Sequence, residues 1–155
     1  MIKEGVKAPD FTLTASDGKE VSLKSFQGKK RVVLYFYPKD DTPGCTVEAC
    51  AFRDTIKAVE KIDAVVLGVS PDGAASHKKF VEKFKLPFLL LSDEEKKVCQ
   101  AYEIWVKKSM YGREYMGVAR TTFIIGKEGK IEKIFEKVKP EGHAEEVLVF
   151  LKQSA

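Results

Sequence analysis

Continuous apolar runs alternate with amphipathic stretches along the chain, and together they predict a series of strands and helices. After Arg31, the run RVVLYFY at 31–37 is continuously apolar or aromatic and rich in β-branched and aromatic residues, which is typical of a strand buried on both faces. The run AVVLGVS at 64–70 predicts a second buried strand, and a short strand is expected at 88–91. Between these strands, residues 42–61 and 74–84 have helical spacing.

The two ends of the chain predict antiparallel hairpins and a closing helix. FTLTASDGKEVSL at 11–23 reads as two short strands around an Asp-Gly turn. Residues 121–125 and 131–135 predict another hairpin, and residues 142–152 predict a helix with one apolar face. Apolar hairpins of this kind extend a sheet at its edges.

The order of these elements predicts the fold class. Ser92 or Asp93 suits the cap of one further helix that runs through Tyr102. Strands separated by helices favour parallel neighbours with right-handed crossovers, and the terminal hairpin adds antiparallel strands. We therefore predict an α/β protein with a thioredoxin-like fold. Its mixed central sheet is flanked by helices on both faces and carries an N-terminal β-hairpin.

Composition narrows the class of protein further. The chain has 155 residues, enough for one domain over 1–155 with one core, and 44% apolar with 32% charged residues indicates a globular protein. The net charge of +4 is scattered, without a basic block, so no nucleic-acid partner is expected. No run approaches the ~20 apolar residues of a membrane span, and the N-terminus lacks a secretory h-region. We expect a cytoplasmic protein, and the lack of a long interface tail favours a monomer.

Three cysteines carry the candidate chemistry. In a reducing compartment they serve as packing residues, metal ligands or catalysts rather than as a disulfide framework. Cys45 and Cys50 are too far apart in sequence for a CxxC motif, which disfavours a dithiol–disulfide oxidoreductase acting on proteins. His77 and His143 have no second ligand at helical spacing, so we assign no zinc site.

Cys45 occupies the turn between the first buried strand and the first long helix. Thr42 suits the N-cap, Pro43 the first helical position, and Gly44 permits close backbone approach. Cys45 then falls at the third helical position, where free N–H groups and the helix dipole favour a thiolate. This position indicates a catalytic nucleophile; the alternative is a small residue at a helix start with no chemistry.

Cys50 and Cys99 have more than one interpretation. In a regular helix, residues five apart have Cα atoms roughly 8.6 Å apart, beyond the ~4.4–6.8 Å that a disulfide requires. A bond between Cys45 and Cys50 would therefore require the first turns of the helix to unwind. Cys50 is otherwise a buried helical cysteine. Cys99 lies in the helical stretch KKVCQAYEIW, where packing is favoured, with resolution of Cys45 as the alternative.

Longer motifs resemble a known family. The stretch PKDDTPGC at 38–45 fits the P-x-x-x-T-x-x-C pattern of peroxiredoxins. The wider segments APDFTL, VVLYFYPKDDTPGCTVEAC, VLGVSPD, LLSDE, GVARTTFIIGKEGKIEKIF and GHAEEVL extend the likeness over nearly the whole chain. On these segments the chain resembles the bacterioferritin comigratory protein (PrxQ) subfamily.

The resemblance implies a role for five residues. Cys45 matches the peroxidatic cysteine, and Cys50 matches the resolving cysteine of members that have one in this helix. Thr42 matches the threonine whose hydroxyl contacts peroxide and thiolate, and Pro38 matches the proline that shields the pocket from water. Arg120 matches the arginine that supports the thiolate and the peroxide.

The resemblance also implies the reaction and its partners. It implies a thiol peroxidase that reduces hydrogen peroxide and organic hydroperoxides, with thioredoxin as the usual reductant and no metal or organic cofactor. A sulfenic acid on Cys45 would condense with a thiol to a disulfide, and Cys50 is the nearest in sequence. The alternative from another class is a non-enzymatic redox sensor that uses the same thiols.

Charged residues near the cysteines complete the expectations. Glu48 follows Cys45 by three residues on the same side of the helix, where a bare carboxylate would oppose the thiolate. We expect Glu48 to pair with Arg120 and orient it, or else to be solvated. Arg53 lies too far along the helix to reach Cys45; Arg31 and Arg113 are set aside on the family match alone.

Overall fold

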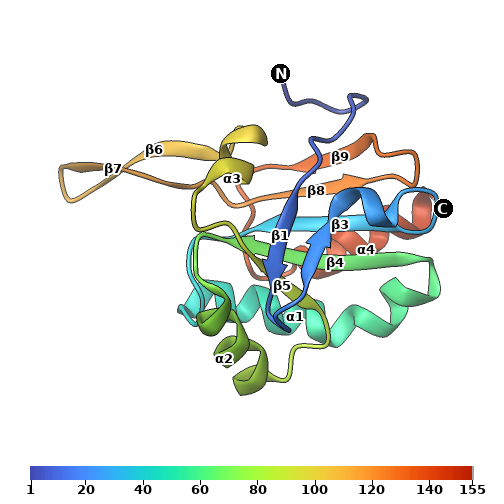
Figure 1. The fold of residues 1–155 in the computed structure, drawn as a ribbon, viewed down its shortest axis with the longest axis horizontal. Coiled ribbons are helices and arrows are strands. Elements are labelled where there is room, and N and C mark those ends of the chain that lie inside the picture. Colours follow the sequence, from blue (N-terminus) through green and yellow to red (C-terminus); the bar gives the residue numbers. More distant parts are fainter. Residues whose placement is uncertain (155) are drawn as a thin grey trace.

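A seven-stranded mixed sheet forms the centre of the protein in this computed structural model, which describes residues 1–154 (Figure 1). The strands lie in the order β2-β1-β5-β4-β3-β8-β9. The strands of this sheet are β1 (Thr12–Ala15), β2 (Glu20–Ser22), β3 (Arg31–Phe36), β4 (Ala64–Ser70), β5 (Leu89–Ser92), β8 (Thr121–Ile125) and β9 (Ile131–Phe135). The helices are η1 (Leu23–Phe26), a 3-10 helix, and α1 (Pro43–Lys61), α2 (Ala74–Phe84), α3 (Lys97–Ala101) and α4 (His143–Gln153).

Strand directions agree with the predicted mixed sheet. β3, β4 and β5 are parallel neighbours, joined by crossovers that contain α1 and α2. β8 pairs antiparallel with β3, and β9 pairs antiparallel with β8. The N-terminal hairpin of β1 and β2 joins the opposite edge through antiparallel pairing with β5. The predicted thioredoxin-like architecture is confirmed.

Both faces of β3 are buried, as its apolar sequence predicts. Val33 and Tyr35 face a core that α1, α2 and α4 cover. Val32 and Leu34 face the second core, under the N-terminal segment, η1 and α3. Alternate residues of one strand therefore contribute to two separate hydrophobic clusters, which fixes the register of the central strand.

The helix predicted from Ser92 or Asp93 to Tyr102 is wrong in its extent. Strand β5 continues to Ser92, and α3 begins only at Lys97. The Asp93 carboxylate nevertheless accepts the N–H groups of Val98 and Cys99, at 3.2 and 2.8 Å. Asp93 thus caps the helix from outside it, after an intervening turn that ends at Lys96 in the left-handed conformation (φ 60°).

The helical spacing over 42–61 predicts an apolar face made of Val47, Phe52, Ile56 and Val59, and the structure differs from it at one position. Phe52, Ile56 and Val59 are buried as predicted, but Val47 is 42% exposed. Val47 precedes Phe52 by five residues, which is about 140° around a helix at 3.6 residues per turn. Glu48 takes the buried position instead, so the core-facing row of α1 includes a carboxyl group.

A projecting hairpin was not predicted. Strands β6 (Trp105–Met110) and β7 (Arg113–Val118) pair only with each other and form an arm that extends away from the sheet (Figure 1). Tyr111 and Gly112 both have positive φ, as a two-residue type I′ turn requires. Of the stretch KKVCQAYEIW that is expected to be helical, Lys97–Ala101 forms α3, but the helix ends there and Trp105 begins β6. Among residues 1–154, no helix has the length and apolar character to cross a membrane.

Candidate active site

The start of α1 places Cys45 beyond the carboxyl end of the central strand β3. Thr42 is the N-cap residue, with extended backbone (φ −93°, ψ 156°), and its carbonyl accepts the Thr46 N–H at 2.8 Å. Its hydroxyl makes no capping bond and instead donates to the Lys39 carbonyl at 2.9 Å. Because the first N–H groups of a helix have no acceptor within it, this end of α1 favours a negatively charged sulfur.

Arg120 connects the cysteine to a buried carboxylate. Its Nη2 donates to Cys45 Sγ at 3.0 Å, and its Nη1 donates to Glu48 Oε1 at 3.0 Å. Cys45 and Glu48 are each 1% exposed, whereas the Arg120 side chain is 21% exposed. One guanidinium therefore faces both groups from the short connection between β7 and β8. The pairing of Glu48 with Arg120 that the sequence suggested is present, and Glu48 is not solvated.

The pKa of the Glu48 carboxyl group lies near neutral pH. Burial raises its pKa from 4.5 to about 7, and the attraction of Arg120 offsets only part of that rise. The 3.0 Å ion pair describes the ionised form, while the raised pKa shows that the protonated form is accessible at neutral pH. Protonation of Glu48 removes a negative charge beside the sulfur and leaves the guanidinium facing Cys45.

Gly44 allows the guanidinium to approach the helix closely. A Cβ at this position would lie 2.9 Å from Arg120 Nη2 and 3.4 Å from Pro140 Cγ. The backbone of Arg120 is itself fixed, because its carbonyl accepts the Val138 N–H at 3.1 Å. Glycine at 44 therefore provides the space in which Arg120 reaches Cys45.

Cys50 lies in the same intact helix as Cys45 and is half-buried. Both thiols are free in this state. Regular helical geometry separates their Cα atoms by roughly 8.6 Å, too far for a disulfide while α1 remains folded. The arrangement describes the reduced form, in which the two sulfurs are held apart.

Cys99 is a packing residue in this structure. It is fully buried beneath the sheet, in the core opposite that of Cys45. Burial, together with a hydrogen bond and repulsion from Asp93, raises the pKa of the Cys99 thiol well above its usual value. These surroundings disfavour a thiolate, so they support the packing interpretation over resolution of Cys45.

Three other arginines lie elsewhere. Arg31 donates to Glu132 and to the Leu151 carbonyl. Arg53 donates to its neighbour Asp54 and to the Phe84 carbonyl. Arg113 is exposed on the projecting hairpin. Among the four arginines of residues 1–154, Arg120 is the one that donates a hydrogen bond to Cys45.

Pro38 and Thr42 lie on the loop that precedes Cys45, and both are half-buried. The same loop contains Asp40, which sequence reasoning did not select. Asp40 is buried and lies 2.6 Å from the ring of His77, a residue that we had considered isolated. A buried acid inside the motif PKDDTPGC was the available signal, but its partner is 37 residues away and only the fold shows it.

Lys108 of the projecting hairpin is a second residue that the sequence did not indicate. Partial burial and the charge of Arg120 lower its pKa, while Cys45 acts in the opposite direction. The charge of Lys108, in the middle of β6, therefore interacts with both Arg120 and Cys45.

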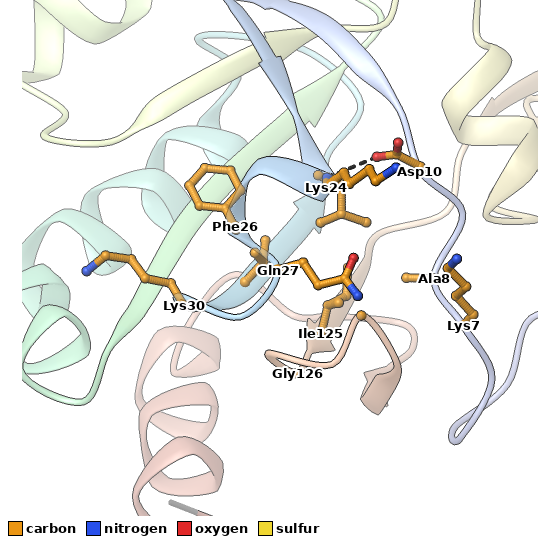
Figure 2. A pocket seen from close by; sticks show the side chains of 12 residues that line it. Lys7, Ala8, Asp10, Lys24, Phe26, Gln27, Lys30, Ile125 and Gly126 are labelled. Atoms are coloured by element: carbon orange, nitrogen blue, oxygen red, sulfur yellow. Dashed lines mark hydrogen bonds between the residues drawn. The ribbon is translucent and has the colours of Figure 1, made fainter.

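A separate cavity of about 110 Å³ lies at the other end of β3. Lys30 and Val32, at the start of that strand, line it together with η1 and the turn after β8 (Figure 2). Its lining contains no cysteine or histidine, and Cys45 follows the opposite end of β3. This cavity is therefore distinct from the site around Cys45.

Comparison with known proteins agrees with this geometry. Residues 5–134 match the model of the AhpC/TSA family. Peroxiredoxin Bcp of Bacillus subtilis is 51% identical over 151 residues, covering 97% of this chain and 96% of that protein. PrxQ of Xylella fastidiosa superimposes with a TM-score of 0.94 at 36% identity, covering 99% and 98% of the two chains. The bacterioferritin comigratory protein of Xanthomonas campestris, studied for alkyl peroxide reduction, gives 0.92 at 36% identity, covering 98% and 99%.

The fold and the thiol site define a thiol-dependent peroxidase on a thioredoxin-like scaffold. In this chain the cysteine at the start of α1 accepts a hydrogen bond from the Arg120 guanidinium. The chain belongs to the AhpC/TSA family and, within it, to the bacterioferritin comigratory protein (PrxQ) peroxiredoxins.

Proposed function

We propose that Cys45 is the nucleophile that reduces hydrogen peroxide and organic hydroperoxides. The observation that carries the proposal is the 3.0 Å hydrogen bond from Arg120 to Cys45 Sγ at the N-terminal end of α1. Guanidinium and helix N–H groups both favour a thiolate, and the same donors stabilise charge on the departing oxygen. Alkyl peroxide reduction by the X. campestris relative supports the inclusion of organic substrates.

The first step transfers one oxygen atom to sulfur. The Cys45 thiolate attacks the outer oxygen of the hydroperoxide, the O–O bond breaks, and a proton completes the leaving alcohol or water. Cys45 becomes a sulfenic acid. In this step Thr42 orients the peroxide through its hydroxyl, Pro38 limits water, and Arg120 stabilises both charged oxygen and sulfur. Glu48 orients Arg120 through their ion pair.

The second step uses Cys50. Its thiol attacks the Cys45 sulfenic acid, a disulfide forms and water leaves. Because an intact helix keeps the two Cα atoms roughly 8.6 Å apart, the first turns of α1 must open. Thioredoxin or a similar dithiol then reduces the disulfide. The enzyme acts as a cytoplasmic, single-domain monomer.

Three serine variants test this assignment. Cys45→Ser should abolish peroxide turnover with thioredoxin and its reductase, and Cys50→Ser should halt it after one equivalent of peroxide. Cys99→Ser should retain turnover, because Cys99 is buried in the opposite core. Full activity of Cys45→Ser would refute the proposal. Oxidation of wild type without turnover would instead indicate a redox sensor.

Amide hydrogen exchange tests the opening of α1. Residues 42–52 should lose protection in the oxidised protein, while the β3 and β4 strands stay protected. Equal protection of residues 42–52 in the reduced and oxidised proteins would contradict the proposed unwinding. Light scattering of the reduced protein measures whether it is a monomer.

A further inference from the structure

A buried polar cluster connects α2 to the loop that precedes Cys45. His77 of α2 is fully buried, and its Nδ1 lies 2.6 Å from Asp40 Oδ2. Its Nε2 lies 3.0 Å from the Leu91 carbonyl oxygen. Tyr37 donates its hydroxyl to Asp40 Oδ1 at 2.6 Å. Buried groups of this kind are retained only when their hydrogen bonds are satisfied.

The partners of His77 determine where its protons lie. A carbonyl oxygen only accepts, so Nε2 carries a hydrogen and donates to Leu91. Nδ1 faces a carboxylate oxygen at 2.6 Å, and that distance places one proton between the ring and Asp40. The contact is therefore a short hydrogen bond between two buried side chains.

Asp40 is held through its backbone as well as its side chain. Its N–H donates to Asp72 Oδ2 at 2.8 Å, and Ser76 donates its hydroxyl to Asp40 Oδ2 at 2.8 Å. Asp40, Asp72 and His77 also lie close enough to suggest a cation site. The hydrogen bonds account for the Asp40–His77 contact, because 2.6 Å between ring nitrogen and carboxylate leaves space for a proton alone.

Asp40 lies between the two loop residues that we propose act at Cys45, Pro38 by limiting water and Thr42 by orienting the peroxide. Asp40 follows Pro38 by two residues and precedes Thr42 by two. Asp41 has a left-handed backbone (φ 56°), and the Thr42 hydroxyl donates back to the Lys39 carbonyl. A fixed Asp40 thus fixes both ends of this tight loop. Besides His77 and Ser76, Lys83 also joins α2 to the loop, through an exposed ion pair with Asp41 at 2.7 Å.

We propose that His77 is a positioning residue for the peroxidase reaction, acting through Asp40 to hold Thr42 and Pro38 beside Cys45. The inference rests on the proposed function, since it concerns the reaction of Cys45 with peroxide. His77 touches neither the substrate nor the sulfur. Its effect is on the geometry of the loop, and small displacements of positioning groups are costly in enzyme reactions.

His77→Gln tests the proposal through the single-turnover reaction of Cys45 with hydrogen peroxide. The rate constant should fall about 10- to 100-fold, the loss expected when reacting groups are displaced by about 1 Å. Alkylation of Cys45 by iodoacetamide, followed by mass spectrometry, should not slow, since it needs no aligned hydroxyl. Equal losses in both reactions would overturn the proposal.

A double-mutant cycle separates positioning from general destabilisation. If His77 acts through Thr42, adding His77→Gln to Thr42→Val should cause little further loss of the peroxide rate. Multiplied losses would overturn the proposal. The matched control is His143→Gln, because His143 is equally buried and hydrogen-bonded, to Thr122 and Glu146, but lies on α4. An equal loss in this control would also overturn it.

Two further variants keep the test decisive if His77→Gln does not fold. Ser76→Ala removes one hydrogen bond to Asp40 and leaves the His77 pair intact, so it should slow the peroxide reaction several-fold. Lys83→Met removes only the exposed pair and should have a smaller effect. A wild-type rate in Ser76→Ala would then overturn the proposal. Failure of the proposed function is separate, since it would leave wild type itself without peroxide turnover.

Discussion

The buried carboxyl group of Glu48 makes the stability of the reduced protein depend on pH within a defined window. Burial raises its pKa in the folded state from 4.5 to about 7, with partial compensation by Arg120. In the unfolded chain the carboxyl titrates at its ordinary value of 4.5. Between these two values the folded state binds one more proton than the unfolded state. The free energy of unfolding therefore falls as the pH rises.

The size of the change follows from the pKa difference. One pKa unit corresponds to about 1.4 kcal/mol, so the rise from 4.5 to about 7 removes about 3 kcal/mol from the unfolding free energy. The stabilisation that the protonated Glu48 carboxyl gives to the folded state is complete below pH 4.5 and is lost above pH 7. Glu48→Gln replaces the carboxyl with an amide that cannot ionise, and its oxygen still accepts from Arg120. We expect this variant to keep the stability that wild type loses.

Urea denaturation under reducing conditions measures the effect. The unfolding free energy of Glu48→Gln relative to wild type should rise by about 3 kcal/mol between pH values of about 4.5 and 8. Glu60→Gln, an exposed change on the same helix, is the control and should follow wild type at both pH values. A difference between Glu48→Gln and wild type that is the same at both values would refute the reasoning.

Two glycines give further predictions. Gly44→Ala places a Cβ 2.9 Å from Arg120 Nη2, so peroxide turnover should fall about tenfold or more by displacement of the guanidinium. Its thermal midpoint should also fall, because the displaced guanidinium no longer pairs with the buried Glu48 carboxylate; unchanged turnover would show that Arg120 adjusts freely. In Gly68→Ala the added Cβ would lie 2.7 Å from Leu90 Cδ2 and 2.9 Å from the Tyr35 ring. This overpacking should destabilise the fold by about 1–3 kcal/mol. Denaturation measures this loss, and a wild-type midpoint would contradict it.

The central strands and their helices could be predicted from local pattern because each one buries a continuous or periodic apolar surface. After Arg31, RVVLYFY has no alternating charged position, and in the structure both faces of β3 are covered. The arm of β6 and β7 has no such signal, since its side chains are mostly half-exposed or exposed and it meets a core only at its base, through Trp105 and Val118. Its type I′ turn at Tyr111 and Gly112 was the one local indication, and the preceding helical pattern obscured it.

The candidate site likewise contains residues that the local sequence indicates and contacts that only the fold reveals. Cys45 could be identified from neighbouring residues, because a helix start is a local feature of the chain. The partner of Asp40 could not, since His77 reaches it only after the crossover that places β4 beside β3 and α2 beside the loop. Sequence spacing carries no information on such a contact, which depends on strand order.

Glu48 shows how a departure from local pattern can nevertheless mark a candidate site residue. The spacing of Cys45, Phe52 and Ile56 marks the buried face of α1, and a helix at 3.6 residues per turn places residue 48 on that face. A carboxyl there conflicts with burial unless a cation meets it, and in this fold Arg120 does so. The raised pKa shows that the cation does not fully offset the burial. Such an uncompensated cost is expected where it serves the chemistry of an adjacent group, here the Cys45 sulfur that shares the guanidinium.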